Sequence, residues 1–211
     1  MKFKLFVLML ILQASVVKSQ NIDINLLNKF NPNSGAENPG WKFVSNNAIY
    51  MSAATPLALM AVGMANHDQK LKQVAFSTGV ALIGNTIITM GLKSSIQRQR
   101  PFVTFADKVM LQGNTSPTDY SFPSGHTSTA FSVATSVSLA YPKWYVIAPS
   151  FAFASATAYS RMYRGAHYPS DVLCGIVVGS GTAYLTNKLQ KLMYNKRTQR
   201  QQRALALAAG E

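Results

Sequence analysis

Residues 160–171 read Ser-Arg-Met-Tyr-Arg-Gly-Ala-His-Tyr-Pro-Ser-Asp, and the rest of the chain can be understood as a support for this segment. His167 and Asp171 are four residues apart, a separation at which two side chains meet on one helical face. The carboxylate can then accept the Nδ1 proton of the imidazole and leave Nε2 free. Arg161 lies upstream, and its guanidinium fork suits phosphate oxygens. Alone, the segment also fits an ordinary helix start, where an acidic residue and Pro169 are both favoured.

Two further segments carry polar residues of the same types. One runs from Lys93 to Pro101 as Lys-Ser-Ser-Ile-Gln-Arg-Gln-Arg-Pro, and the other is Ser121-Phe-Pro-Ser-Gly-His126. Together with residues 160–171, they resemble the three-part signature of the type 2 phosphatidic acid phosphatase superfamily. All three blocks match without a substitution and stand in the family's order. The resemblance covers about residues 45–190.

The resemblance implies a phosphatase that works through a phosphohistidine. His167 would attack phosphorus while oriented by Asp171, and His126 would be the general acid. The implied phosphate-binding residues are Lys93, Arg100, Ser124, Gly125 and Arg161. The implied reaction needs no cofactor, and no Cys, His or carboxylate spacing in the sequence suggests a metal site. The remaining histidine, His67, is expected in a loop on the opposite side.

The chemistry of phosphate transfer agrees with these residue types. The transition state spreads negative charge over three oxygens, so the site must supply positioned positive charge. Lys93 and Arg100 are two helical turns apart, and Pro101 disfavours helix at Arg100, so a bend can bring both cations to one anion. Ser124 stands at the start of an apolar segment, where helix N-terminal amides favour an anion; its hydroxyl could also cap the helix.

Charge-free apolar segments determine the predicted fold. The 211 residues suffice for one domain. An all-α bundle is predicted from five such segments, at about 47–66, 73–92, 127–141, 144–160 and 172–187. Each has close to the roughly 20 residues that a spanning helix needs, so we expect about five transmembrane helices. Because the segments are rich in small and hydroxyl side chains, a soluble bundle is the alternative. Small residues also permit close membrane packing, as in the GxxxG pair Gly175 and Gly179.

The flanking regions differ from this core. Residues 1–19 resemble a signal peptide, with Lys2 and Lys4 before an apolar run, and an uncleaved anchor is the alternative. Residues 20–45 predict a polar exported arm with a short helix near 24–30. Residues 46–190 are assigned to the catalytic domain. Residues 191–211 form a basic tail.

The net charge of +13 allows nucleic acid, an anionic membrane or an anionic substrate as partner. Basic residues gather in the tail and in the loops predicted for one side, the positive-inside pattern. The motifs then face outward from the cell membrane, toward the periplasm or cell exterior. Without aromatic or motif context for nucleic acid, the tail is interpreted as a solvated end near anionic lipid. The predicted partners are a lipid phosphate and membrane lipids. The sequence does not determine the oligomeric state.

Several alternatives remain open at this level. The resemblance implies substrates such as undecaprenyl diphosphate, phosphatidylglycerol phosphate, phosphatidic acid or lipid A phosphates. A soluble exported acid phosphatase acting on small phosphomonoesters is the main alternative. A vanadium haloperoxidase and a non-enzymatic lipid-binding subunit are two others. Arg98 and Arg164 could contact a second phosphate, and a solvated role suits them equally.

Overall fold

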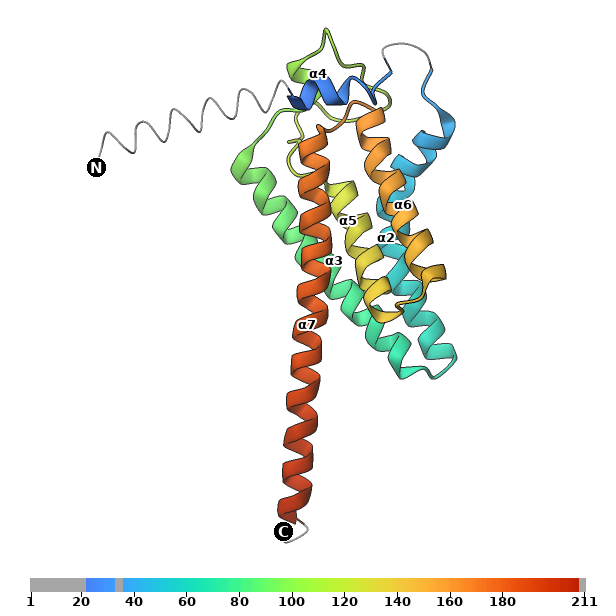
Figure 1. Cartoon of the computed structure of the whole chain (residues 1–211), viewed down its shortest axis with the longest axis vertical. Helices are drawn as coiled ribbons and strands as arrows, with labels where there is room; N and C mark the ends of the chain where they lie inside the picture. The colour runs from blue at the N-terminus through green and yellow to red at the C-terminus, as the bar shows by residue number, and fades with distance from the viewer. Residues whose placement is uncertain (1–21, 33–35, 209–211) are drawn as a thin grey trace, which may run out of the picture.

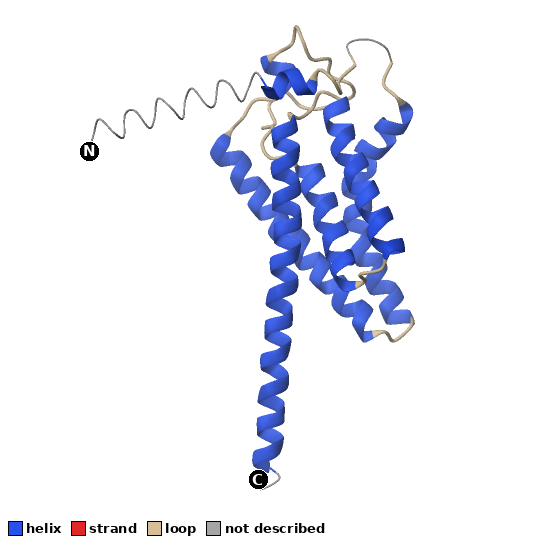
Figure 2. Ribbon diagram, in the orientation of Figure 1, coloured by secondary structure: helices blue, strands red, loops and turns tan. Residues whose placement is uncertain are grey.

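The protein is an antiparallel helical bundle (Figures 1 and 2). The computed structural model describes residues 22–32 and 36–208, and within these ranges every regular element is a helix. The long helices are α2 (Pro39–Ala65), α3 (Gln69–Ile96), α5 (Gly125–Ala140), α6 (Trp144–Tyr163) and α7 (Pro169–Ala208). A short helix at 22–27 and α4 (Pro101–Thr104) lie at one end of the bundle. The all-α prediction is confirmed, whereas the signal peptide predicted at 1–19 lies outside the described residues.

Helix α2 begins earlier than the apolar segment predicted near residue 47. Asn38 caps it, since its side-chain oxygen accepts from the amides of Gly40 (2.9 Å) and Trp41 (3.3 Å). Pro39 occupies the first turn, where its missing N–H is harmless. The Asn-Pro-Gly triplet at residues 38–40 is therefore a helix start.

The end of α3 provides the bend expected before Pro101. Gln97 adopts a left-handed conformation with φ of 52° and donates its backbone N–H to the Lys93 carbonyl. Arg100 is extended, as a residue before proline prefers, and Pro101 begins α4. This turn directs Arg100 back over the end of the bundle.

Two glycines allow α7 to approach α5 closely. A Cβ at Gly175 would lie 2.8 Å from the Ser124 carbonyl oxygen, and one at Gly179 only 2.1 Å from that of Ser128. The interpretation of this GxxxG pair as a close-packing face is confirmed. The Ser124 amide consequently donates to the Asp171 carbonyl at 3.0 Å, which places two of the three motif segments side by side.

The apolar helices α2 and α3 present much of their surface outward. α2 and the region Gln69–Thr104, which contains α3, are long and apolar enough to cross a membrane. Only 17% and 39% of their apolar windows are buried, whereas the core helix of a soluble protein is mostly buried. α5 has 16 residues, or about 24 Å, and packs at the centre against the other four long helices. Spanning by α5, α6 and α7 remains a prediction.

The bundle has two chemically different ends. The chain direction places the end of α3 and the starts of α5 and α7 together, and the short helices lie over them (Figure 1). The opposite end carries Lys70, Lys72 and Lys143 at the starts of α3 and α6. α7 continues to Ala208, so the backbone of the basic region 191–208 is helical. The position of these lysines and of the basic end of α7, opposite the motifs, agrees with the predicted sidedness of the chain.

Candidate active site

All the predicted site residues lie at the same end of the bundle. They occupy the end of α3, the turn before α4, the start of α5, the last turn of α6, the α6–α7 connection and the first turn of α7: Lys93, Arg100, Ser124, Gly125, His126, Arg161, His167 and Asp171. His67 lies between α2 and α3 at the opposite end, as expected. Three segments distant in sequence therefore form one site.

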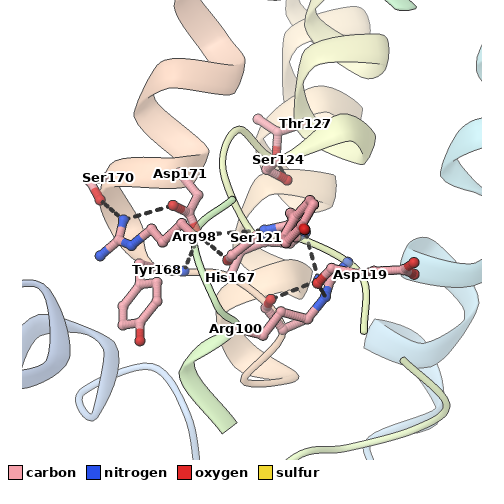
Figure 3. A network of polar contacts seen from close by, with 12 residues as sticks. Arg98, Arg100, Asp119, Ser121, Ser124, Thr127, His167, Tyr168, Ser170 and Asp171 are labelled. Atoms are coloured by element: carbon pink, nitrogen blue, oxygen red, sulfur yellow. Dashed lines mark hydrogen bonds and ion pairs between the residues drawn. The ribbon is translucent and has the colours of Figure 1, made fainter. Parts of the chain in front are cut away.

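His167 lies in the connection before α7, and only 1% of it is exposed. Its Nδ1 is 3.5 Å from Asp171 Oδ2 and 3.4 Å from the Ser121 hydroxyl (Figure 3). The expected pairing with Asp171 is present, but the expected shared helical face is not, because α7 begins only at Pro169. Both distances exceed that of a strong hydrogen bond, so a small movement would be needed to tighten either contact.

Arg100 covers the other ring nitrogen of His167. Its Nη1 lies 3.2 Å from Nε2 and donates to the Ala166 carbonyl at 2.9 Å, while its Nε donates to the Asp119 carbonyl at 3.0 Å. A guanidinium can only donate, so Nε2 acts as the acceptor and the ring proton belongs on Nδ1, facing Asp171. Nε2 is therefore unprotonated, although it is not free of contacts as the sequence suggested.

Asp171 is fully buried and is held by three donors. Oδ1 accepts from Arg98 Nη1 at 2.8 Å, and Oδ2 accepts from the Tyr168 amide at 2.9 Å and from the Ser121 hydroxyl. Ser121 therefore contacts both the carboxylate and the imidazole (Figure 3). Sequence reasoning gave Ser121 no role, although it begins the second motif block.

A cavity of about 560 Å³ is lined by Arg100, which contacts His167, and by His126 and Arg161, among others. Arg161 is only 4% exposed, and its Nη1 donates to the Ser45 hydroxyl at 2.6 Å. Its buried Nε has no hydrogen-bond partner. A buried charged donor without a partner is unfavourable unless a ligand satisfies it, so this cavity suits an anion.

The remaining predicted phosphate contacts, Lys93, Ser124 and Gly125, are not among the residues that line this cavity. Lys93 and Gly125 line an adjoining pocket between α2, α3 and α5, and the Lys93 ammonium donates to the Tyr120 carbonyl. Ser124 is fully buried, and its hydroxyl pairs with that of Thr127 at 2.9 Å. Ser124 occupies the N-cap position of α5 without the side-chain capping bond that was its alternative role, and its hydroxyl pairs with that of Thr127 instead.

This geometry agrees with the comparison against known families, in which the PAP2 superfamily matches residues 71–193. The chain belongs to the PAP2 superfamily. It is 33% identical over 116 residues to the undecaprenyl-diphosphatase of Sulfolobus acidocaldarius, covering 53% of this chain and 55% of the relative. It is 39% identical over 109 residues to a lipid A 1-phosphatase of Porphyromonas gingivalis, covering 50% of this chain and 21% of the relative.

A crystal structure of Aquifex aeolicus LpxE superposes with a TM-score of 0.63 and 26% identity, covering 79% of this chain and 95% of that one. By contrast, the alignments span about half the length of the first curated relative and about a fifth of the second. The PAP2 match begins at residue 71, so α2 and the segment before it lie outside that match.

Two arginines beside the PAP2 motifs are occupied by internal partners. Arg98 donates to both Asp23 and Asp171 at 2.8 Å. Arg164 pairs with Glu37 at 2.7 Å and also donates to the Asn46 side chain and the Gln112 carbonyl. These contacts do not favour the suggestion that either arginine reads a second phosphate. No sequence pattern in the polar arm indicated its acidic partners.

Burial lowers the pKa of His167 well below 6.5, and the positive charges of Arg161, Arg100 and Lys93 lower it further. Because the shift is downward, the ring is neutral at pH 7 and gains a proton only at a pH well below 6.5. A nucleophilic imidazole must be neutral, so the neutral ring suits the role that the sequence predicted for His167.

We expect the His167 ring to remain neutral as the pH is lowered from 7 to about 5. Nuclear magnetic resonance of the protein labelled at histidine carbon Cε1 would test this, with His167→Asn identifying the relevant signal. The expected signal shows no protonation shift over this range. A titration midpoint at or above 6.5, the ordinary histidine value, would contradict the described environment.

Proposed function

We propose that this PAP2 chain is a metal-independent phosphohydrolase acting on a lipid phosphate or diphosphate. The observation that carries the proposal is the buried Arg161, whose Nε has no hydrogen-bond partner and whose side chain lines a cavity together with His126 and Arg100. Arg100 in turn contacts the unprotonated nitrogen of His167. A nucleophile, an acid and anion-binding groups thus lie within one end of the bundle.

The proposed reaction has two steps. His167 Nε2 attacks phosphorus as the bond to the leaving oxygen breaks, and His126 gives that oxygen a proton. Water then attacks the phosphohistidine, His126 takes a proton from it, and phosphate leaves with His167 restored. Arg100, Arg161 and Lys93 stabilise the charge on the equatorial oxygens, assisted by the first-turn amides of α5 at Gly125. Asp171 stabilises the ring as positive charge develops.

Lipid substrates are supported by the relatives' names and by the surface of the bundle. The relatives are named for undecaprenyl diphosphate and lipid A. Leu57 on α2 and Ile83 and Ile87 on α3 are largely exposed, which suits contact with acyl chains. A soluble acid phosphatase acting on small esters fits this apolar surface less well.

We further propose five membrane-spanning helices, with the site at the outer face of the cell membrane. The lysines at the starts of α3 and α6, together with the basic end of α7, lie at the end opposite the motifs. By the positive-inside rule that end is cytoplasmic, which places His167 toward the periplasm or cell exterior.

The test of this function is phosphate release by the purified full chain in detergent. The panel contains undecaprenyl diphosphate, lipid A, phosphatidylglycerol phosphate and phosphatidic acid, with a small aryl phosphate as the soluble comparison. We expect at least one lipid to be turned over with a higher kcat/KM than the aryl phosphate. Preference for the small ester, together with activity that leaves membranes in high salt, would support the soluble alternative instead.

His126→Ala should lower turnover most for the substrates with the poorest leaving groups. An alkyl phosphate needs protonation of its leaving oxygen, so we expect a loss of about 10²- to 10⁴-fold. An aryl phosphate with an acidic phenol should lose far less. Steady-state kcat for the two substrates measures the difference, and equal losses on both would remove His126 from the acid role.

Removal of divalent metals should leave turnover unchanged. Residues 22–32 and 36–208 contain no group of three His, Cys, Asp or Glu side chains suited to a metal ion. Lys93, Arg100 and Arg161 can supply the positive charge instead. Activity after dialysis against EDTA checks this. A loss that magnesium reverses would show that the metal-free assignment is wrong.

A further inference from the structure

Asp23 comes from the segment that precedes the PAP2 match, yet it contacts Arg98 and Ser170, which lie next to the motif residues. It is only 6% exposed, and its Oδ1 accepts from the Ser170 amide at 2.9 Å. Its Oδ2 accepts from Arg98 Nη2 at 2.8 Å and from the Ser170 hydroxyl. A buried carboxylate with this set of donors is fixed in position.

Arg98 connects this carboxylate to Asp171. Nη2 binds Asp23, while Nη1 donates to Asp171 Oδ1 at 2.8 Å and to the Ser170 hydroxyl at 2.7 Å. The guanidinium also lies over the Tyr168 ring, 3.8 Å from its centroid (Figure 3). A planar fork that binds one carboxylate at each end transmits the position of one to the other.

We propose that Asp23 is a positioning residue for the catalytic imidazole, acting through Arg98 and Asp171. The inference rests on the proposed function of His167. The Asp171 carboxylate lies 3.5 Å from His167 Nδ1, so it must approach slightly to form a normal hydrogen bond. Arg98, held by Asp23, determines where Oδ1 lies and therefore how Oδ2 faces the ring.

Other contacts support the view that the N-terminal region belongs to the site. Asn31 donates to the carbonyls of Met110 (2.9 Å) and Tyr163 (2.8 Å), which joins the loop after α4 to the end of α6. Ser45, near the start of α2, accepts from Arg161. The region before residue 71 thus contacts the segment that carries both Arg161 and His167.

Asp23→Asn keeps the size of the side chain but removes the charge that holds Arg98. We expect kcat to fall about 10- to 100-fold, because a small misplacement of a reacting group has an effect of this size. KM should change less than about twofold, since Asp23 does not line the anion cavity. Asp23→Glu should recover part of the lost kcat. Asp107→Asn, in the exposed turn after α4, is the matched control and should behave as wild type.

The double variant Asp23→Asn/Asp171→Asn shows whether Asp23 acts through Asp171 or contributes to kcat independently of it. If Asp23 acts through Asp171, the double variant will have the kcat of Asp171→Asn alone. The inference would be overturned if the loss of kcat in the double variant equalled the product of the losses in the two single variants. A kcat of Asp23→Asn equal to that of the Asp107 control would also overturn it. Should Asp23→Asn not purify as folded protein, Asp23→Glu carries the test, and a wild-type kcat for it would count against positioning. A wild-type chain inactive on every phosphate would instead refute the proposed function.

Discussion

His167→Ala will remove turnover while leaving the protein folded. The proposed covalent step has no other acceptor, because His126 is assigned to proton transfer and His67 lies at the far end of the bundle. We expect kcat to fall by about 10⁴-fold or more, the size of loss seen when a nucleophile is removed. Arg100 keeps its bonds to the Ala166 and Asp119 carbonyls, so the substitution leaves no wholly unpaired guanidinium.

The measurement is phosphate release, with the thermal unfolding midpoint recorded for the same preparation. His67→Ala is the matched control and should keep wild-type turnover. Residual activity within about tenfold of wild type would show that phosphorus is attacked by water or by another group.

Arg161→Met should lower activity without lowering stability. The variant loses the guanidinium of a residue that lines the anion cavity, so we expect kcat/KM to fall by about 10²- to 10⁴-fold. Replacement of a buried charge by an apolar side chain of similar length is often neutral or stabilising. The unfolding midpoint should therefore be unchanged or higher than that of wild type.

Activity and calorimetry of the same samples test the pair of effects. Lys108→Met removes an exposed charge after α4 and is the matched control, expected to change neither quantity. Arg161→Lys should recover little activity, since an ammonium cannot reproduce the planar fork. A destabilised Arg161→Met protein with near-normal kcat/KM would mean that Arg161 serves the fold and not the anion.

The motif residues and the course of the chain between them could be predicted well from sequence. Pro101 indicated the bend that returns Arg100 to the site, and the structure has that bend. Gly175 and Gly179 indicated a close-packed face, and a Cβ at either would collide with the α5 backbone. These two predictions are correct because each depends on the properties of only one or two residues.

Contacts between distant segments could not be predicted in the same way. Asp23 and Arg98 are 75 residues apart, and nothing in either neighbourhood indicates that they pair. The engagement of Ser124 with Thr127, in place of a helix cap, likewise depends on complete burial. The separation of four between His167 and Asp171 correctly suggested proximity but not the loop conformation, since Pro169 starts the helix after His167.

The most direct test of the account is to trap the phosphorylated enzyme. The purified chain is mixed with a lipid phosphate that carries an isotopic label in its phosphoryl group. The reaction is quenched in alkali within milliseconds, and the protein is digested and analysed by mass spectrometry. We predict an acid-labile phosphoryl group on the peptide containing His167, absent from His167→Ala and increased in His126→Ala when an aryl phosphate is used. A chain that turns over substrate with no phosphoryl group on His167, or with the group on another residue, would contradict the account.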